Sequence, residues 1–253
     1  MRNFKLYICM LSLCFLFLPS LVWAETESDF VIVSENTKYY KTVTYRNSQL
    51  YSLNNNVSSE TFEISEVEYN SIQPDSLVLL SNYSGEVETT YKSMTTTIST
   101  NGSYYRYKVV LNWKNIPSTR SYDIIGIGFL GSVKVRNNLN FQQYYCVTSS
   151  GCTTSTTNYP QIFSSGAGTT FKLPTGNLYS LKQTLYFDVE KNTTSTIILQ
   201  EAYGDYSHAT SSISLTNAKK YSVVANVGIS LNSSITSYYD TISVAKAGWS
   251  GTW

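Results

Sequence analysis

The single histidine of the chain, His208, is the residue best suited to acid–base chemistry. It lies three residues after Asp205, and Asp188 is a second acid that could orient its ring. A histidine held by a carboxylate can activate a serine hydroxyl as a nucleophile. However, the chain has no Gly-x-Ser-x-Gly turn to present such a serine. A structural histidine is therefore the favoured interpretation, and a secreted hydrolase using His208 is the alternative.

Metal ligands are sparse in this sequence. A zinc site needs three or four histidine or cysteine ligands, and beyond the apolar start the chain offers His208, Cys146 and Cys152. No Asp-x-Asp-x-Asp loop typical of calcium sites occurs, although scattered loop oxygens leave calcium binding open. The sequence predicts no metal site and no cofactor.

The two cysteines Cys146 and Cys152 are separated by five residues of a Ser/Thr/Gly-rich loop. In an oxidising compartment such near neighbours are expected to pair as a disulfide. Reactive dithiols usually have two intervening residues at a helix start. The spacing therefore favours a structural disulfide, which would stabilise a local turn.

Tyrosine is abundant, with 22 residues in the chain. Pairs of adjacent tyrosines place one ring on each face of a strand, so one ring of each pair is expected in the core and the other at the surface. Exposed tyrosines provide binding area at low entropic cost. The candidate binding residues from this reasoning and from the histidine segment are Tyr104, Tyr144, Asp205, Tyr206 and His208.

Alternation of apolar and polar residues predicts that strands position these side chains. Residues 105–113, 181–189 and 221–231 each place their apolar side chains on one face with a period of two. Many such segments, separated by Gly, Pro, Asn and Ser turns, are typical of an antiparallel β-sandwich. The predicted fold class is therefore all-β, with a sandwich-like domain over residues 81–253.

One short helix is predicted in the polar segment 25–80. Ser65 and Glu68 form a capping box, and Pro74 would end the helix, which gives a span of about 66–72. Segment 25–80 is interpreted as an N-terminal extension, either packed on the β domain or loosely tethered to it.

Residues 1–24 have the features of a secretory signal peptide. Arg2 and Lys5 precede an apolar run from Leu6 to Leu18, and Val22 and Ala24 suit the −3 and −1 positions of a cleavage site. The run is shorter than the ~20 residues that span a bilayer. We expect export, cleavage after Ala24 and no transmembrane anchor in the mature chain.

The charge balance argues against some partners. The chain has 18 Lys and Arg against 17 Asp and Glu, and removing Arg2 and Lys5 leaves 16 against 17. Nucleic acids require a basic surface, so no nucleic-acid partner is expected. An extracellular glycan or protein remains the expected ligand, and the oligomeric state stays open.

Three stretches are distinctive together: residues 113–128, 171–174 and 204–209, followed by the C-terminal tryptophans Trp249 and Trp253. They resemble a group of uncharacterised exported proteins of Gram-positive, gut-associated bacteria. The resemblance spans about residues 90–253 and implies secretion from a Gram-positive cell. It carries no activity, ligand or site residue.

These observations favour a secreted, non-catalytic binding or interaction module over an enzyme. Besides the hydrolase, a β-pore-forming toxin is an alternative. Such a toxin needs a membrane-spanning hairpin that alternates apolar and polar residues. Residues 86–98 are the candidate segment, and they are polar on both faces.

Overall fold

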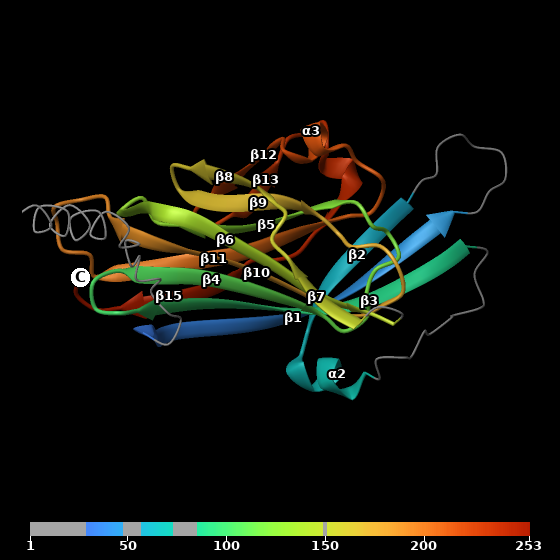
Figure 1. Cartoon of the computed structure of the whole chain (residues 1–253), viewed down its shortest axis with the longest axis horizontal. Coiled ribbons are helices and arrows are strands. Elements are labelled where there is room, and N and C mark those ends of the chain that lie inside the picture. Colours follow the sequence, from blue (N-terminus) through green and yellow to red (C-terminus); the bar gives the residue numbers. More distant parts are fainter. Residues whose placement is uncertain (1–28, 48–56, 73–84, 149–150) are drawn as a thin grey trace, which may run out of the picture. The chain divides into compact units, whose positions relative to one another are not determined.

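The computed structural model describes residues 29–47, 57–72, 85–148 and 151–253, so the predicted signal peptide at 1–24 lies outside the described residues. Val31–Trp253 forms one compact unit. Its strands pair antiparallel in two large sheets and one hairpin (Figure 1). The predicted all-β class is confirmed.

The larger sheet has seven strands in the order β2-β1-β3-β4-β10-β6-β7. Their bounds are β1 Val31–Asn47, β2 Val57–Ile64, β3 Gly85–Thr100, β4 Tyr105–Trp113, β6 Val133–Val147, β7 Gly151–Ser155 and β10 Leu178–Lys191. Segment 25–80, interpreted from sequence as an extension, thus contributes β1 and β2 to this sheet. The toxin candidate 86–98 lies in β3, hydrogen-bonded between β1 and β4.

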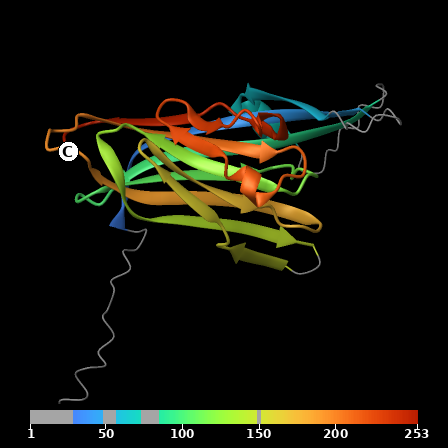
Figure 2. The same ribbon diagram turned by 90° about the horizontal axis from the view of Figure 1, so that it is seen from above.

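The second sheet has six strands. Five of them follow the order β14-β11-β5-β9-β8. The sixth, β15, also pairs with β11, along an earlier part of that strand than β14 does. The bounds are β5 Tyr122–Phe129, β8 Tyr159–Phe163, β9 Gly166–Lys172, β11 Leu199–Ala209, β14 Tyr239–Thr241 and β15 Ala245–Ser250. Figure 2 shows the strands in layers.

One hydrophobic core is built from both sheets. The apolar face predicted for 105–113 is confirmed, because Tyr105, Tyr107, Val109, Leu111 and Trp113 are all buried in this core. The face of 181–189 joins it through β10, and β5, β9, β11 and β15 supply the opposing side chains. The two large sheets therefore bury their facing surfaces against each other.

The other face of the six-stranded sheet is covered by a hairpin. Strands β12 (Tyr221–Val224) and β13 (Gly228–Leu231) pair with each other and pack on β5 and β9. Gly128 permits this contact, because a Cβ there would lie 2.6 Å from the carbonyl oxygen of Val224. Burial on both faces explains why β5 is a nearly continuous buried strand.

The prediction of one continuous strand over 221–231 is wrong. Asn226 and Gly228 adopt φ values of 67° and 80°, and this left-handed backbone turns the chain. Val227, which the period-two pattern puts on the apolar face of this strand, is instead 59% exposed. The turn therefore interrupts the alternation of buried and exposed side chains.

The short helices follow their capping residues. Helix α2 spans Glu66–Ser71, and Ser65 accepts a hydrogen bond from the backbone N–H of Glu68, as predicted from the capping box. After β11 ends at Ala209, the chain leads into α3 (Leu215–Ala218), which is capped by Ser214. Residues 236–238 form the 3-10 turn η3 (Thr236–Tyr238).

Candidate functional site

His208 lies on β11 and faces the core between the two sheets. Its Nδ1 is 3.0 Å from Oδ2 of Asp123 on β5, and its ring meets Trp113 edge-on with centroids 5.4 Å apart. The His208 side chain is 7% exposed. The acid that orients the histidine is therefore Asp123, which the sequence reasoning did not select.

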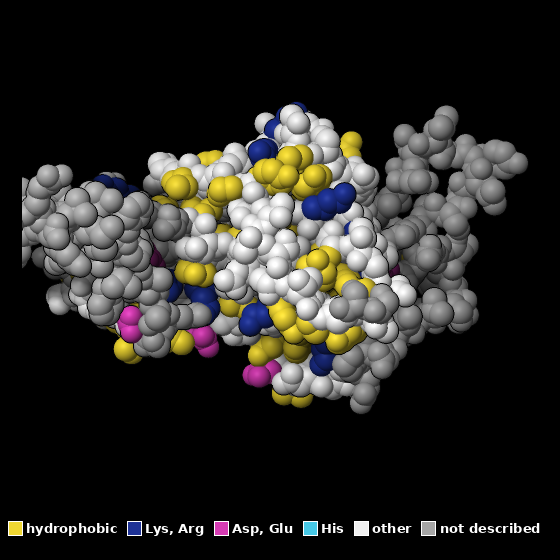
Figure 3. Space-filling view, viewed as in Figure 1, with side chains coloured by type: hydrophobic (Ala, Val, Ile, Leu, Met, Phe, Trp, Pro, Cys, Tyr) yellow, Lys and Arg dark blue, Asp and Glu magenta, His cyan; other side chains and the backbone are white. Residues whose placement is uncertain are grey.

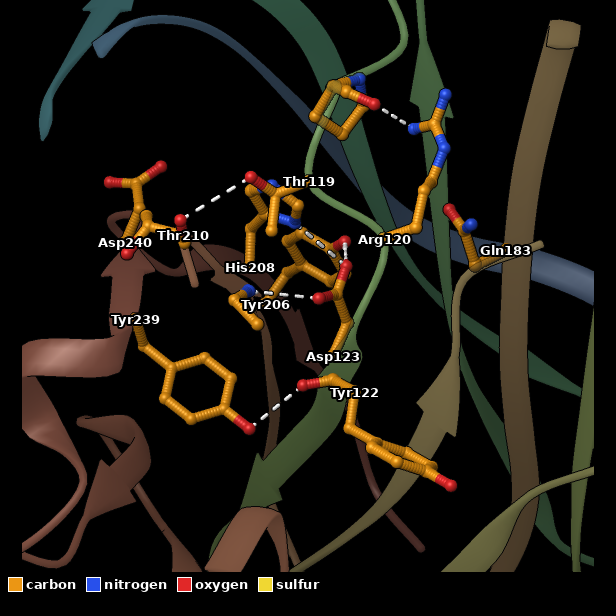
Figure 4. A network of polar contacts seen from close by, with 12 residues as sticks. Thr119, Arg120, Tyr122, Asp123, Gln183, Tyr206, His208, Thr210, Tyr239 and Asp240 are labelled. Carbon is orange, nitrogen blue, oxygen red and sulfur yellow. Dashed lines mark hydrogen bonds and ion pairs between the residues drawn. The ribbon is translucent and has the colours of Figure 1, made fainter. Parts of the chain in front are cut away.

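Asp123 is a buried acceptor for three groups. Its Oδ2 accepts from the Tyr206 hydroxyl as well as pairing with His208, and its Oδ1 accepts from the Ala209 backbone N–H at 2.9 Å. Figure 4 shows its carboxylate directed toward Tyr206 and His208. Burial and the neighbouring carboxylate raise the pKa of Tyr206 well above its usual value. Tyr206 thus remains a hydrogen-bond donor to Asp123.

Asp205 is not brought to His208. Residues three apart on a strand point to opposite faces, so Asp205 faces the β12–β13 hairpin. Its carboxylate accepts from the backbone N–H groups of Ile229 and Tyr206, each at 2.6 Å. Burial raises the pKa of Asp205 to about 8, although these backbone donors oppose the shift. Asp188, the other predicted orienter, pairs with Arg106 at 2.7 Å.

A second buried pair lies in the same core. Nζ of Lys92 on β3 is 3.3 Å from Oδ2 of Asp240 on β14, and the amine lies over the rings of Trp113 and Tyr206 at 4.9 and 5.9 Å from their centroids. We call Lys92, Asp123, Tyr206, His208 and Asp240 the buried polar cluster.

Strand phase could have revealed two of its members. Counted in steps of two along its strand, Lys92 shares a face with the buried Met94, Thr96 and Ile98. In the same way, Asp123 shares a face with Ile125 and Ile127. A charged residue in phase with a core face is a buried charge, which needs a partner. The partner itself is not visible in the sequence.

The chemistry open to the cluster follows from its burial. Lys92 and Asp123 are both 0% exposed, and Asp240 is 6% exposed, so groups that could transfer protons face one another rather than solvent.

Within the described ranges, no group of three or more His, Cys, Asp or Glu side chains is placed to hold a metal ion. In the same part of the chain, no helix has the length and apolar content required to cross a bilayer.

The predicted binding tyrosines do not form one surface. Tyr104 precedes β4 and is half-buried, with the Arg136 guanidinium 4.1 Å from its ring centroid. Tyr144 on β6 is 41% exposed and pairs in register with Lys182. Tyr105, next to Tyr104, pairs with Val189. Tyr104 and Tyr144 therefore lie toward opposite ends of the strands in the seven-stranded sheet.

Tyr144 has a neighbour that the sequence reasoning missed. Tyr179, at a bulge in β10, is 63% exposed, and its hydroxyl lies 3.5 Å from Sγ of Cys152. The hydroxyl of Tyr144 lies 3.4 Å from Sγ of Cys146. The predicted Cys146–Cys152 disulfide is present and joins directly opposed residues of β6 and β7. We call Tyr144, Tyr179 and this disulfide the tyrosine patch.

The patch lies where the seven-stranded sheet ends. Strand β7 is its edge, and four of the five residues of β7 are exposed. Figure 3 shows hydrophobic side chains, a class that includes tyrosine, over the region where Figure 1 places β7. Two solvent-exposed rings and a disulfide beside a strand edge offer both aromatic area and backbone hydrogen-bonding groups.

Comparisons with known proteins add little to this description. No family model matches the chain, and no curated protein matches it. A solved structure with partial likeness is the full-length major pilin SpaD from Corynebacterium diphtheriae, at 7% identity and a TM-score of 0.27 over 68% of this chain. The match covers 56% of that pilin. This degree of likeness assigns neither a fold nor a function.

Proposed function

We propose that this protein is a secreted, non-catalytic interaction module with a β-sandwich-like body, which binds an extracellular glycan, surface polymer or protein through the tyrosine patch. The observation that carries the proposal is the exposure of Tyr144 and Tyr179 beside the Cys146–Cys152 disulfide at a sheet edge. Amphipathic rings held on a rigid strand pair lose little conformational entropy on binding.

The export part of the proposal rests on two features. A disulfide persists in oxidising compartments and is rare in the cytosol, and the Cys146–Cys152 bond links adjacent strands. The N-terminal 24 residues have signal-peptide character. N-terminal sequencing of the exported protein should begin at Glu25, and a product that retains Met1 would contradict export with cleavage.

A glycan array and a cell-wall pull-down test the binding surface. The variants Tyr144→Ala and Tyr179→Ala should each weaken binding, because each removes one exposed ring. The matched control is Tyr45→Ala, which removes a ring that is 44% exposed. Tyr45 lies on β1, near the opposite edge of the same sheet from β7. Equal binding by wild type and both patch variants would contradict the patch.

A hydrolase substrate panel tests the alternative. The proposal predicts no turnover by the wild-type protein on peptide, ester and glycoside substrates. Turnover that is lost in His208→Ala, while circular dichroism shows a folded variant, would replace the binding proposal with a hydrolase that uses the His208–Asp123 pair.

A further inference from the structure

Lys92 and Asp240 place an amine against a carboxyl group between the two sheets. Lys92 is fully buried on β3, and Asp240 is 6% exposed on β14. Their nearest polar atoms, Nζ and Oδ2, are 3.3 Å apart. Lysine is almost never fully buried in proteins unless it is paired. The pair links strands 148 residues apart in the chain and belonging to different sheets.

The surroundings of this pair are apolar on one side and hydroxylic on the other. The rings of Trp113 and Tyr206 lie over the lysine amine. The Thr42 hydroxyl accepts from Nζ at 3.1 Å and donates to Oδ2 of Asp240 at 3.1 Å. The Thr61 hydroxyl donates to Oδ1 at 2.5 Å. Both carboxylate oxygens and the amine are therefore held in fixed positions.

Burial makes the amine reactive. Desolvation lowers the pKa of Lys92, although the Asp240 carboxylate opposes the shift. A lysine that loses its proton in an apolar site becomes a nucleophile. Passing one proton from Lys92 to Asp240, directly or through the Thr42 hydroxyl, converts the ion pair into a neutral amine beside a neutral carboxylic acid.

We propose that Lys92 and Asp240 condense into an intramolecular amide bond that covalently ties β3 to β14. Nζ attacks Cγ of Asp240, the new C–N bond forms, and the bond from Cγ to Oδ2 breaks. That oxygen leaves as water with two protons, both of which come from the lysine ammonium of the starting ion pair. The reaction changes no oxidation state and needs no cofactor.

The two threonines fit the requirements of this reaction. Negative charge develops on the oxygen that stays bound to Cγ, and the Thr61 hydroxyl already donates to Oδ1. Thr42 touches both the amine and the leaving oxygen, so it can relay the protons that convert that oxygen into water. Thr42 and Thr61 are thus catalytic residues of the condensation.

Confinement and desolvation favour the product. Groups held in contact react as if at very high concentration. An ion pair removed from water pays a large desolvation cost that a neutral amide avoids. The exposed pair Lys38–Glu63 has a shorter separation, 2.8 Å, but its side chains are 25% and 49% exposed. Water solvates those charges, so we expect no condensation there.

Mass spectrometry of the full-length exported protein tests the proposal. The intact mass should be lower than the mass calculated for the sequence from Glu25 by two hydrogens for the disulfide and by one water. A tryptic digest should contain a branched peptide joining the Lys92 and Asp240 segments, with no cleavage after Lys92. Separate, unmodified peptides carrying Lys92 and Asp240 would overturn the proposal, whatever the intact mass. In the same digest, Lys38 and Glu63 should be unlinked.

Variants of the two reacting groups and of Thr42 separate the chemistry from folding. Asp240→Asn should yield the same branched peptide as wild type, because loss of ammonia from the amide gives the same product. Asp240→Ala should yield none. Thr42→Val should lower the cross-linked fraction at a given time after synthesis of the chain, and a fraction equal to that of wild type would overturn the role of Thr42. The wild-type digest decides the bond itself even where a variant fails to fold.

Discussion

Gly204 on β11 lies directly against Thr96 on β3, across the interface between the two sheets. A Cβ at position 204 would lie 2.1 Å from Oγ1 of Thr96 and 2.9 Å from a methyl carbon of Val109. The sheets approach this closely because no side chain stands at that point of β11. The glycine is therefore required by packing between sheets.

We predict that Gly204→Ala destabilises the protein by about 1–3 kcal/mol, the usual range for adding a methyl group to a packed core. The measurement is the free energy of unfolding in urea. Gly131→Ala is the matched control, because nothing lies within 4 Å of a Cβ there. A Gly204→Ala variant as stable as Gly131→Ala would show that the two sheets are not packed as described.

Removing the Asp123 carboxylate should be costly. Asp123→Ala leaves the Tyr206 hydroxyl, the His208 ring and the Ala209 N–H without their buried acceptor. We expect the free energy of unfolding to fall by about 3–5 kcal/mol. Glu190→Ala, which breaks the exposed Lys134–Glu190 pair, should cost less than about 1 kcal/mol. Similar losses in both variants would contradict a buried, paired Asp123.

Charge substitutions should distinguish the core strand β4 from the β12–β13 turn. Leu111→Asp places a carboxylate at a position that is 0% exposed, and a loss of about 4 kcal/mol or more is expected against a total stability of about 5–15 kcal/mol. Val227→Asp should change stability by less than about 0.5 kcal/mol, because Val227 is 59% exposed. Thermal unfolding followed by circular dichroism compares the two. If Val227→Asp unfolds the protein, the result would contradict the turn and support the continuous strand expected from the sequence.

Asp205 should make stability fall as pH rises. Its folded pKa is raised to about 8 by burial, whereas an unfolded aspartate has a pKa of about 3.9. Between these values the folded state keeps a proton that the unfolded state has lost, so raising the pH favours unfolding, with a slope of at most about 1.4 kcal/mol per pH unit. The free energy of unfolding of wild type relative to Asp205→Asn should therefore decline between about pH 4 and 8. Parallel profiles would contradict the raised pKa.

Reduction should act on one bond in the mature protein. If residues 1–24 are removed, Cys146 and Cys152 are the remaining cysteines. Closing so short a loop restricts the unfolded chain by roughly 2–3 kcal/mol, so reductant should lower the free energy of unfolding by about that amount. The double variant Cys146→Ser, Cys152→Ser should show no response to reductant. Thiol alkylation of the oxidised, denatured protein should label neither cysteine.

Local features of the fold followed from the sequence because they depend on neighbouring residues. The period-two pattern of 105–113 identified the buried face of β4, and Ser65 with Glu68 identified the start of α2. The short spacing of Cys146 and Cys152 was enough to predict their disulfide. The period-two pattern gave a wrong prediction over 221–231. Apolar residues alternate across the whole segment, and the alternation does not reveal the turn that the left-handed backbone at Asn226 and Gly228 makes.

Only the tertiary structure decided which polar groups meet. Asp205 is close to His208 in sequence, yet alternation along β11 places the two on opposite faces, and the partner of His208 is Asp123, 85 residues away. Lys92 and Asp240 are joined in the same way by the packing of two sheets. The sequence marks Lys92 and Asp123 as buried charges by their position on a core-facing side of a strand, but the choice of partner depends on sheet order and register, which arise from long-range pairing.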